Sequence, residues 1–294
     1  MKAIIILSNA DFSANNIGQY VEVSQLTKNV LSKQTQYGEE SAEAIALNSF
    51  LTSLTNNGFL GGESPLLTDL IIPALAASHS ELLYNIAHLD ESGYPTNSMG
   101  ETEAAETTEA NWTNIPVIVN GKIIACRFKG ADNTKKFSHH IFDAYTNGSD
   151  QPSYAAGFYG VENSFLNGDS INENFPFFFT TNSLKMSYST SNVAHTVTAS
   201  SANGFVGLGF VNDYGFEMTA DNMSIGSPNV TGSLSAFKVR DAIREFHLGS
   251  ANATAGRNYA TSVIFGGQYM NSTKLTELKG HIVTLLTALH IINE

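Results

Sequence analysis

The sequence has one cysteine, Cys126, among its 294 residues. An internal disulfide is therefore excluded, and the fold must be held by its hydrophobic core. No window reaches the roughly 18 apolar residues of a membrane-spanning helix. The opening apolar run, residues 3–7, is too short for a secretory signal, and Asp11 interrupts it. We therefore expect a soluble protein that is not exported by the usual route and contacts no membrane.

Basic residues are missing from one long stretch of the chain. No Lys or Arg occurs between Lys33 and Lys122, while residues 34–121 contain 12 of the 27 acids, so the whole net charge of −12 lies there. Nucleic-acid binding is not expected, because it requires a basic face. A solvated acidic surface is the usual interpretation of such a stretch, and a surface that docks on a basic partner is the alternative.

Catalytic signatures are also missing. A retaining glycosidase needs an acid and a nucleophile about 5 Å apart, but Glu162 and Glu217, on strand candidates, have no acidic residue two positions on. No Gly-X-Ser-X-Gly motif occurs. The glycine run 204–209 resembles a nucleotide loop, but it lies in a strand pattern with no following helix, which predicts close packing within a sheet. The sequence indicates a non-enzymatic protein without a cofactor.

Two segments hold residues that could bind a metal. His139 and His140 are adjacent on a strand candidate, so they point to opposite faces, and one packed and one solvent-facing histidine is the favoured interpretation. The turn at 167–174 supplies oxygen ligands that suit Ca²⁺, namely Asn167, Asp169, Asn172 and Glu173. It lacks the spacing of an EF-hand loop. A plain polar turn is favoured, and a calcium site is the alternative.

What the chain has instead is the composition of a β-rich protein. Asn, Ser and Thr make up more than a quarter of it, and only 14% is charged. Asn120-Gly121 between two apolar, mostly β-branched runs predicts a two-residue type I′ hairpin. Further strand candidates are residues 153–161, 175–181, 184–189, 194–200, 204–211, 214–218, 235–249 and 261–267. Without crossover helices between them, these strands predict a mainly β fold, an antiparallel sandwich or jelly roll.

Two amphipathic helices are predicted to flank this β region. The first, within residues 39–57, has an apolar stripe and ends at Gly58; the stripe is Ala44, Leu47, Phe50, Leu51 and Leu54. The second follows a cap at Asn271 or Ser272; its stripe is Leu275, Leu278, Ile282, Leu285, Leu286 and Leu289. Between them, Pro73 breaks an apolar segment whose second half could begin a sheet. Residues 90–111 are acidic and low in complexity, which predicts a loop or flexible insertion.

Residues 1–38 are predicted to form an extended anchoring arm. The apolar side chains of Ile4, Ile5 and Ile6 have no core of their own, so they are most simply satisfied by adding a strand to another subunit. The Asn-rich turn that follows would redirect the chain and place Phe12 and Ile17 as side-chain plugs. Residues 39–294 are predicted to be one jelly-roll domain. The strand pairing between residues 129 and 200 is left open.

The order of several motifs resembles a known group of proteins. A strand ending in Phe-Gly, the turn "MNSTKLTEL" at 270–278 and the helix "HIVTLLTAL" at 281–289 look like the end of the concanavalin A-like, or laminin-G-like, jelly rolls of phage tail and virion proteins. "FLTSLTNNGFL" followed by "LIIPALAASHSELLYNIAHLD" is similar to the helix and first strand before those jelly rolls. "ADFSANNIG" at 10–18 resembles a short N-terminal signature on several of them. The phages concerned infect Bacteroides-type bacteria.

This resemblance covers the arm, residues 47–90 and roughly 204–292. It implies a structural protein of a tailed phage virion, assembled in the bacterial cytoplasm as a head or tail fibre, decoration or appendage. Its partners would be other copies of itself, capsid or tail proteins bound through residues 1–38, and host-surface carbohydrate for attachment. A soluble or surface glycan-binding lectin is the alternative, with a glycoside hydrolase behind it. The position on the virion, the symmetry and any sugar-binding residues are left open.

Overall fold

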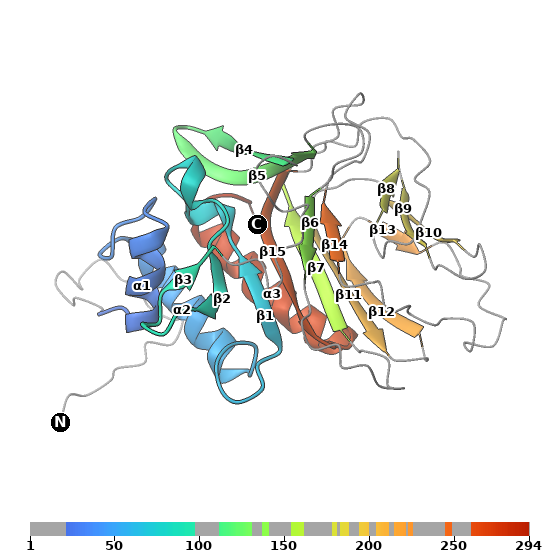
Figure 1. Ribbon diagram of the computed structural model, residues 1–294, viewed down its shortest axis with the longest axis horizontal. Helices are drawn as coiled ribbons and strands as arrows, with labels where there is room; N and C mark the ends of the chain where they lie inside the picture. The colour runs from blue at the N-terminus through green and yellow to red at the C-terminus, as the bar shows by residue number, and fades with distance from the viewer. Residues whose placement is uncertain are drawn as a thin grey trace.

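The structure is a computed structural model of the chain (Figure 1). It describes residues 22–97, 112–130, 137–140, 154–161, 178–180, 183–187, 194–199, 204–211, 215–221, 223–225, 245–248 and 260–293. This part is mainly antiparallel β-sheet with three α-helices, α1 (Gln25–Lys33), α2 (Ala42–Asn56) and α3 (Ser272–Ala288). The predicted mainly β class is thereby confirmed. Within these ranges no helix is both long and apolar enough to cross a membrane.

The strands of the described part form three sheets. In chain order they are β1 (Leu67–Ile71), β2 (Asn85–Leu89), β3 (Pro95–Thr96), β4 (Trp112–Val119), β5 (Lys122–Gly130), β6 (Phe137–His140), β7 (Tyr154–Gly160), β8 (Phe178–Thr180), β9 (Ser183–Ser187), β10 (Ala194–Ala199), β11 (Gly204–Val211), β12 (Gly215–Ala220), β13 (Met223–Ile225), β14 (Glu245–Leu248) and β15 (Ala260–Gln268). The main sheet has the order β12-β11-β7-β15-β1-β2-β3, and β5, which also pairs with β4, joins it at β15. The others are β13-β10-β9-β8 and β14-β6. Two short 3₁₀ helices, η1 (Pro73–Leu75) and η2 (His79–Glu81), lie between β1 and β2.

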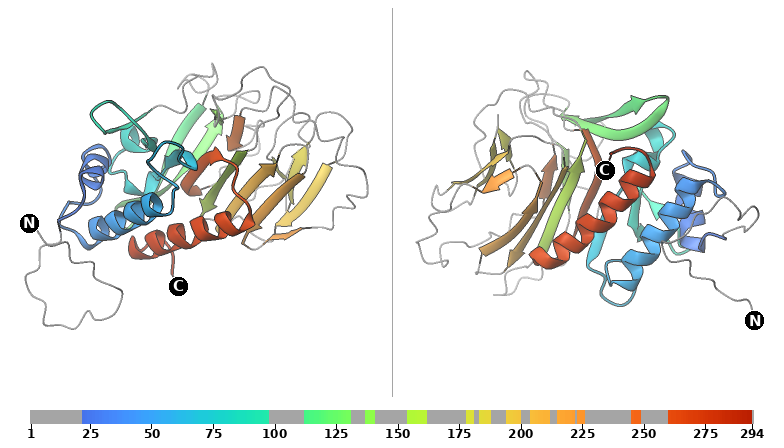
Figure 2. Two further views of the ribbon diagram at one scale, coloured as in Figure 1. Left: turned by 90° about the horizontal axis from the view of Figure 1, so that it is seen from below. Right: turned by 180° about the vertical axis from the view of Figure 1, so that it is seen from behind.

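Helices α2 and α3 cover one face of the main sheet (Figure 2). The predicted stripe of α2 is buried throughout, and Ser41 caps its first turn by accepting a hydrogen bond from the backbone N–H of Ala44. The stripe of α3 is buried in the same way, and of the two predicted caps Asn271 is the one that accepts from Lys274. Both helix predictions are confirmed, and both stripes enter the main core above β1, β7, β11 and β15.

Glycines make room for aromatic rings in this core. The rings of Phe205 on β11 and Phe265 on β15 stack with centroids 5.4 Å apart. Strand β7 lies between β11 and β15, and its Gly157 pairs with Gly207 on one side and with Phe265 on the other. A Cβ on Gly207 would lie 2.7 Å from the Phe205 ring. The run 204–209 is therefore a tightly packed strand, as its pattern predicts.

The opposite face of the main sheet is buried as well. Ile71, Ile264, Phe158 and Val206 are at most 2% exposed, and none of them belongs to the core beneath the helices. Ile71 pairs with Ile264, Ile264 with Phe158, and Phe158 with Val206. They form one apolar stripe across β1, β15, β7 and β11. At these four strands the sheet is consequently shielded from water on both faces.

The prediction of an extended arm over residues 1–38 is wrong for Gln25–Lys33, which forms α1. Ser24 caps this helix by accepting a hydrogen bond from the Thr27 N–H. Val30 and Leu31 are at most 5% exposed and belong to the main core. The helix forms because a good N-cap precedes apolar residues at helical spacing, and packing against α2 supplies the stability that its short length lacks. Residues 1–21 lie outside the described part.

The acidic insertion begins with ordered structure. At its start the Asp90 carboxylate accepts hydrogen bonds from the backbone N–H groups of Ser92 and Tyr94, both at 2.9 Å. Pro95–Thr96 is β3, which pairs with β2, so the loop prediction is wrong there. Residues 98–111 lie outside the described part. The predicted second-half strand after Pro73 is confirmed as β2, while Pro73 itself opens η1.

Candidate interaction surface

The hairpin of β4 and β5 carries the most exposed apolar side chains of the described residues. Its turn has φ of 50° at Asn120 and 79° at Gly121. These are the positive values that a type I′ turn requires, so the prediction is confirmed. Ile118 and Val119, directly before the turn, are 60% and 46% exposed. Leu89, on β2, is the other large apolar residue exposed in this part of the chain, at 40%.

A β-bulge explains why the base of the hairpin is buried and its tip is not. Val117 pairs with Ala125 while Ile118 pairs with Ile123, so Ile124 has no residue opposite it. Val117 is 7% exposed and packs with Ala125 and Ala260. A bulge bends the hairpin and changes the direction in which the side chains beyond it point. Beyond this bulge, two successive β4 side chains face solvent although strand neighbours point to opposite faces.

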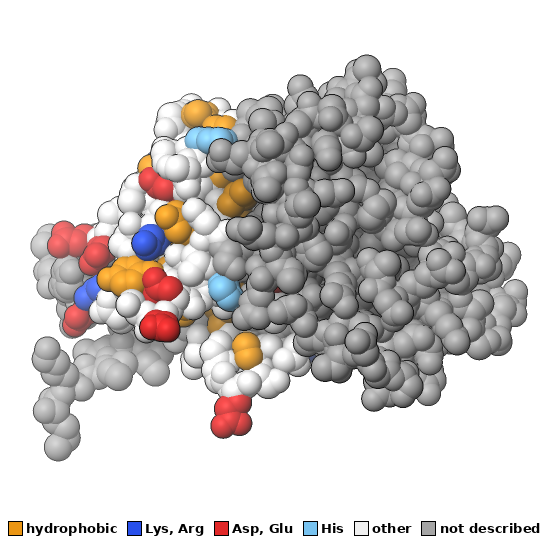
Figure 3. Space-filling view, viewed as in Figure 1, with side chains coloured by type: hydrophobic (Ala, Val, Ile, Leu, Met, Phe, Trp, Pro, Cys, Tyr) orange, Lys and Arg blue, Asp and Glu red, His pale blue; other side chains and the backbone are white. Residues whose placement is uncertain are grey.

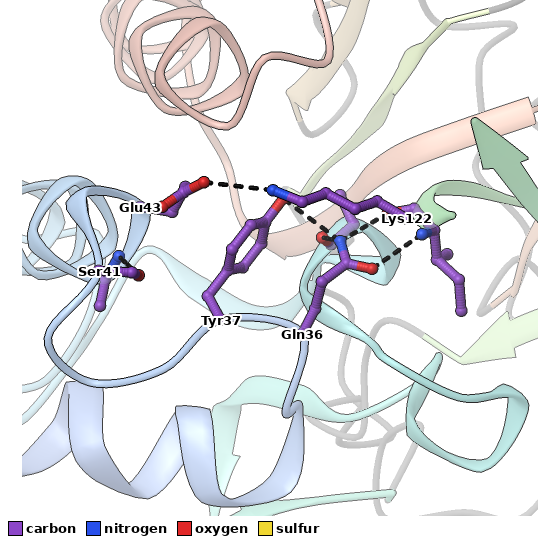
Figure 4. A network of polar contacts seen from close by, with 8 residues as sticks. Gln36, Tyr37, Ser41, Glu43 and Lys122 are labelled. Atoms are coloured by element: carbon purple, nitrogen blue, oxygen red, sulfur yellow. Dashed lines mark hydrogen bonds and ion pairs between the residues drawn. The ribbon is translucent and has the colours of Figure 1, made fainter. Parts of the chain in front are cut away.

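The linker between α1 and α2, residues 34–41, fixes the tip (Figure 4). The Gln36 side chain pairs with the backbone of Ile123: its Oε1 accepts from the Ile123 N–H, and its Nε2 donates to the Ile123 carbonyl, both at 2.8 Å. The same Nε2 donates to the Ala74 carbonyl at 2.8 Å. One side chain therefore acts as a further strand residue beside β5 and ties it to η1.

Lys122, next to the turn, adds an ionic contact to the first turn of α2 and a cation–π contact to the linker. Its Nζ lies 3.2 Å from Oε1 of Glu43 and 4.7 Å from the centre of the Tyr37 ring. Burial raises the pKa of the Tyr37 hydroxyl, although the Gln36 hydrogen bond and the charge of Lys122 act in the opposite direction. Partial burial would raise the pKa of Glu43, but its own backbone N–H and Lys122 hold it below its usual value. The ion pair is partly exposed and adds little stability, but it fixes geometry.

The linker is held from its other side by Glu81 of η2. The Glu81 carboxylate accepts hydrogen bonds from the backbone N–H groups of Thr35 and Ala77, both at 2.8 Å. Burial alone would raise the pKa of Glu81, but these hydrogen bonds lower it below its usual value. Gln34, fully buried, donates to the carbonyl of Ile72 at 3.0 Å. Polar side chains thus join α1, η1, η2 and the hairpin into one unit.

We expect Gln36→Ala to lower the free energy of unfolding by about 1–3 kcal/mol, because its three hydrogen bonds to backbone groups and its contact with the Tyr37 hydroxyl are lost, and partly buried backbone groups lose their partner. Urea denaturation measures this change, and amide hydrogen exchange at Ile123 reports the hairpin locally. The matched control is Gln268→Ala, whose Nε2 bonds only to the exposed Ser64 side chain and which should change stability by less than about 0.5 kcal/mol. Unchanged exchange at Ile123 in Gln36→Ala would contradict the role given to this side chain.

Acidic side chains surround the linker. Glu39 and Glu40, which follow Tyr37, are both exposed. The basic groups whose charges act on neighbouring Glu43 are Lys122, which pairs with it, and His290. Figure 3 shows acidic side chains spread over the described part of one face of the molecule. The exposed acids of residues 34–97 are Glu39, Glu40, Glu63, Asp90 and Glu91. The predicted acidic surface is therefore solvated at these five positions, while Glu43 and Glu81 are partly buried and Asp69 is buried.

Other acidic groups in the described part hold the fold together. The Asp221 carboxylate accepts a hydrogen bond from the Phe205 N–H at 3.0 Å and forms an ion pair with Lys279, which links β11 to α3. Asp69, 2% exposed, accepts from the Asn85 side chain at 2.7 Å and so joins β1 to β2. Both carboxylates have clear structural partners. The hydrogen bonds and the ion pair of these two carboxylates explain their positions without a bound ligand.

None of the site residues predicted from the sequence lies in the described part. These residues are Ile4, Ile5, Ile6, Phe12, Ile17, Asn167, Asp169, Asn172 and Glu173. His139 and His140 lie on β6, opposite Phe246 and Glu245 of β14. Among the described residues no group of three or more His, Cys, Asp or Glu could hold a metal ion. The exposed tip was not predicted, although an apolar run that continues up to the Asn-Gly turn is a signal for it.

The surface made by Ile118, Val119 and the acidic linker, here called the tip surface, can make apolar and ionic contacts. Its parts come from β4, β5 and the α1–α2 linker, held together by Gln36 and Lys122. Such a surface suits binding to another macromolecule. No family model, curated protein or solved structure matches the chain.

Proposed function

We propose that the chain is a non-enzymatic structural protein of a tailed phage virion, a fibre, decoration or appendage subunit anchored through its N-terminal residues. The phage assignment rests on the resemblance of the motifs described above. One observation limits where the anchor can lie: Val23 is buried, Ser24 caps α1, and the Ser24 N–H donates to Asn48 Oδ1 at 2.8 Å, so residues from Val23 onward belong to the folded body. We therefore redraw the proposed anchor as residues 1–21.

We further propose that the β region is a concanavalin A-like jelly roll, displayed by the particle as several symmetric copies and used to attach to host-surface glycans. What supports the fold is that every described strand pair is antiparallel and that the central strands β1, β15, β7 and β11 are buried on both faces. A single layer of helices accounts for only one of these faces. A second sheet on the other face is the arrangement of a sandwich.

The test compares the full chain with a variant lacking residues 1–21, each produced during infection by the phage that encodes it. We expect both to unfold at the same urea concentration, and only the full chain to appear in purified particles by mass spectrometry. Incorporation of the shortened variant would remove the anchor from residues 1–21. Absence of the full chain from particles would overturn the virion assignment. If that free chain bound a glycan array, the lectin alternative would replace it.

A further inference from the structure

The tip surface is built to present two apolar side chains in a fixed position. Ile118 and Val119 are exposed on the last two residues of β4, and the strand opposite them is held by Gln36 and by the Lys122–Glu43 ion pair. A surface that is already ordered loses less conformational entropy on binding. A protruding hairpin held in place by hydrogen bonds and an ion pair is therefore the arrangement expected of a contact site.

Charge decides which kind of partner fits. The carboxylates of Glu39 and Glu40 are exposed in the linker beside the tip, and Glu43 already neutralises Lys122. The surface thus combines apolar side chains with net negative charge. A complementary surface must offer an apolar recess with basic side chains at its rim.

The described side chains of a second copy offer no unpaired lysine to this surface. In the described part, the lysines with placed side chains already have partners: Lys28 with Glu22, Lys33 with the rings of Tyr84 and Tyr94, Lys122 with Glu43, Lys274 with Glu277 and Lys279 with Asp221. Two copies, each of net charge −12, also repel one another. We propose that the tip surface docks into an apolar, Lys- or Arg-rimmed recess on a different protein. This proposal does not depend on the phage assignment.

Site-specific photo-crosslinking tests the proposal in cells that naturally produce the protein. A photoreactive amino acid replaces Ile118 in the full chain, and the control places it at Thr284, an exposed position on α3. We expect the Ile118 position to crosslink to one peptide of a different protein that contains Lys or Arg, and the Thr284 position not to do so. A crosslink to another copy, or no crosslink, overturns the proposal.

Affinity measurements with the crosslinked protein, once purified, separate the two components of the surface. We expect Ile118→Ser with Val119→Thr to weaken binding about tenfold or more, and Glu39→Gln with Glu40→Gln to weaken it about two- to fivefold. Added salt should weaken binding of the original chain more than that of the Gln variant. Equal salt dependence of the two would rule out the ionic component, and an unchanged affinity of the Ser/Thr variant would rule out the apolar one.

Discussion

Gly157→Ala is expected to lower the free energy of unfolding by about 3 kcal/mol or more. An added Cβ would lie 2.0 Å from the carbonyl oxygen of Val206 and 2.4 Å from Cζ of Phe265. The first of these atoms belongs to the backbone of the neighbouring strand, so the clash cannot be relieved by rotating a side chain. β7 must therefore move away from β11, and the Phe265 ring must shift as well, which disturbs its stack with Phe205. Urea denaturation followed by circular dichroism measures the loss.

The matched control for this substitution is Gly280→Ala. Gly280 is exposed in the middle of α3, and an added Cβ there meets nothing within 4 Å. Alanine is the better helix former, so this variant should gain about 0.5–1 kcal/mol. Opposite signs at the two glycines are the expected result. A Gly157→Ala variant as stable as the original chain would show that the Phe265 ring does not pack against Gly157.

Removal of residues 1–38 is expected to abolish cooperative unfolding. This deletion takes away α1 and the first part of the linker, including Val30, Leu31 and Tyr37, each at most 6% exposed. Fully burying each apolar side chain contributes about 1.5–3 kcal/mol, and the three together approach the whole stability of an ordinary domain. The hydrogen bonds of Gln34 and Gln36 to η1 and to the hairpin are lost as well.

Thermal unfolding and near-ultraviolet circular dichroism check this prediction. The control is the variant that lacks residues 1–21, which keeps Ser24 as the cap of α1 and should show the transition of the full chain. A sharp transition in the chain that starts at Glu39 would show that α1 packs on the core but is not needed for its folding. It would then restore residues 1–38 as one separable arm.

Local signals in the sequence predict much of the fold. The stripe Leu47, Leu51, Leu54 and the cap at Asn271 are contained within single helices, and Asn120-Gly121 defines its turn without help from distant residues. Each of these patterns depends on contacts a few positions apart. The sequence can therefore predict them directly.

Other features depend on distant residues and escape this kind of reasoning. The sequence predicts an extended arm through residue 38, but residues 25–33 are helical because Val30 and Leu31 find a core formed by later elements. The fixed tip depends on Gln36 and Ile123, which are 87 positions apart. The bulge at Ile124 breaks the alternation by which buried and exposed strand residues are told apart. For these reasons neither α1 nor the tip surface was predicted.

The proline in β4 affects how readily this edge strand pairs with strands of other molecules at high protein concentration. Among the described strands β4 pairs with β5 alone, so it is an edge strand, and edge strands with free N–H groups recruit further strands into fibrils. Pro116 lacks an N–H, so β4 cannot offer an unbroken row of donors to an incoming chain. An incoming strand would therefore lose one backbone hydrogen bond at Pro116, which disfavours growth of an intermolecular sheet along this edge.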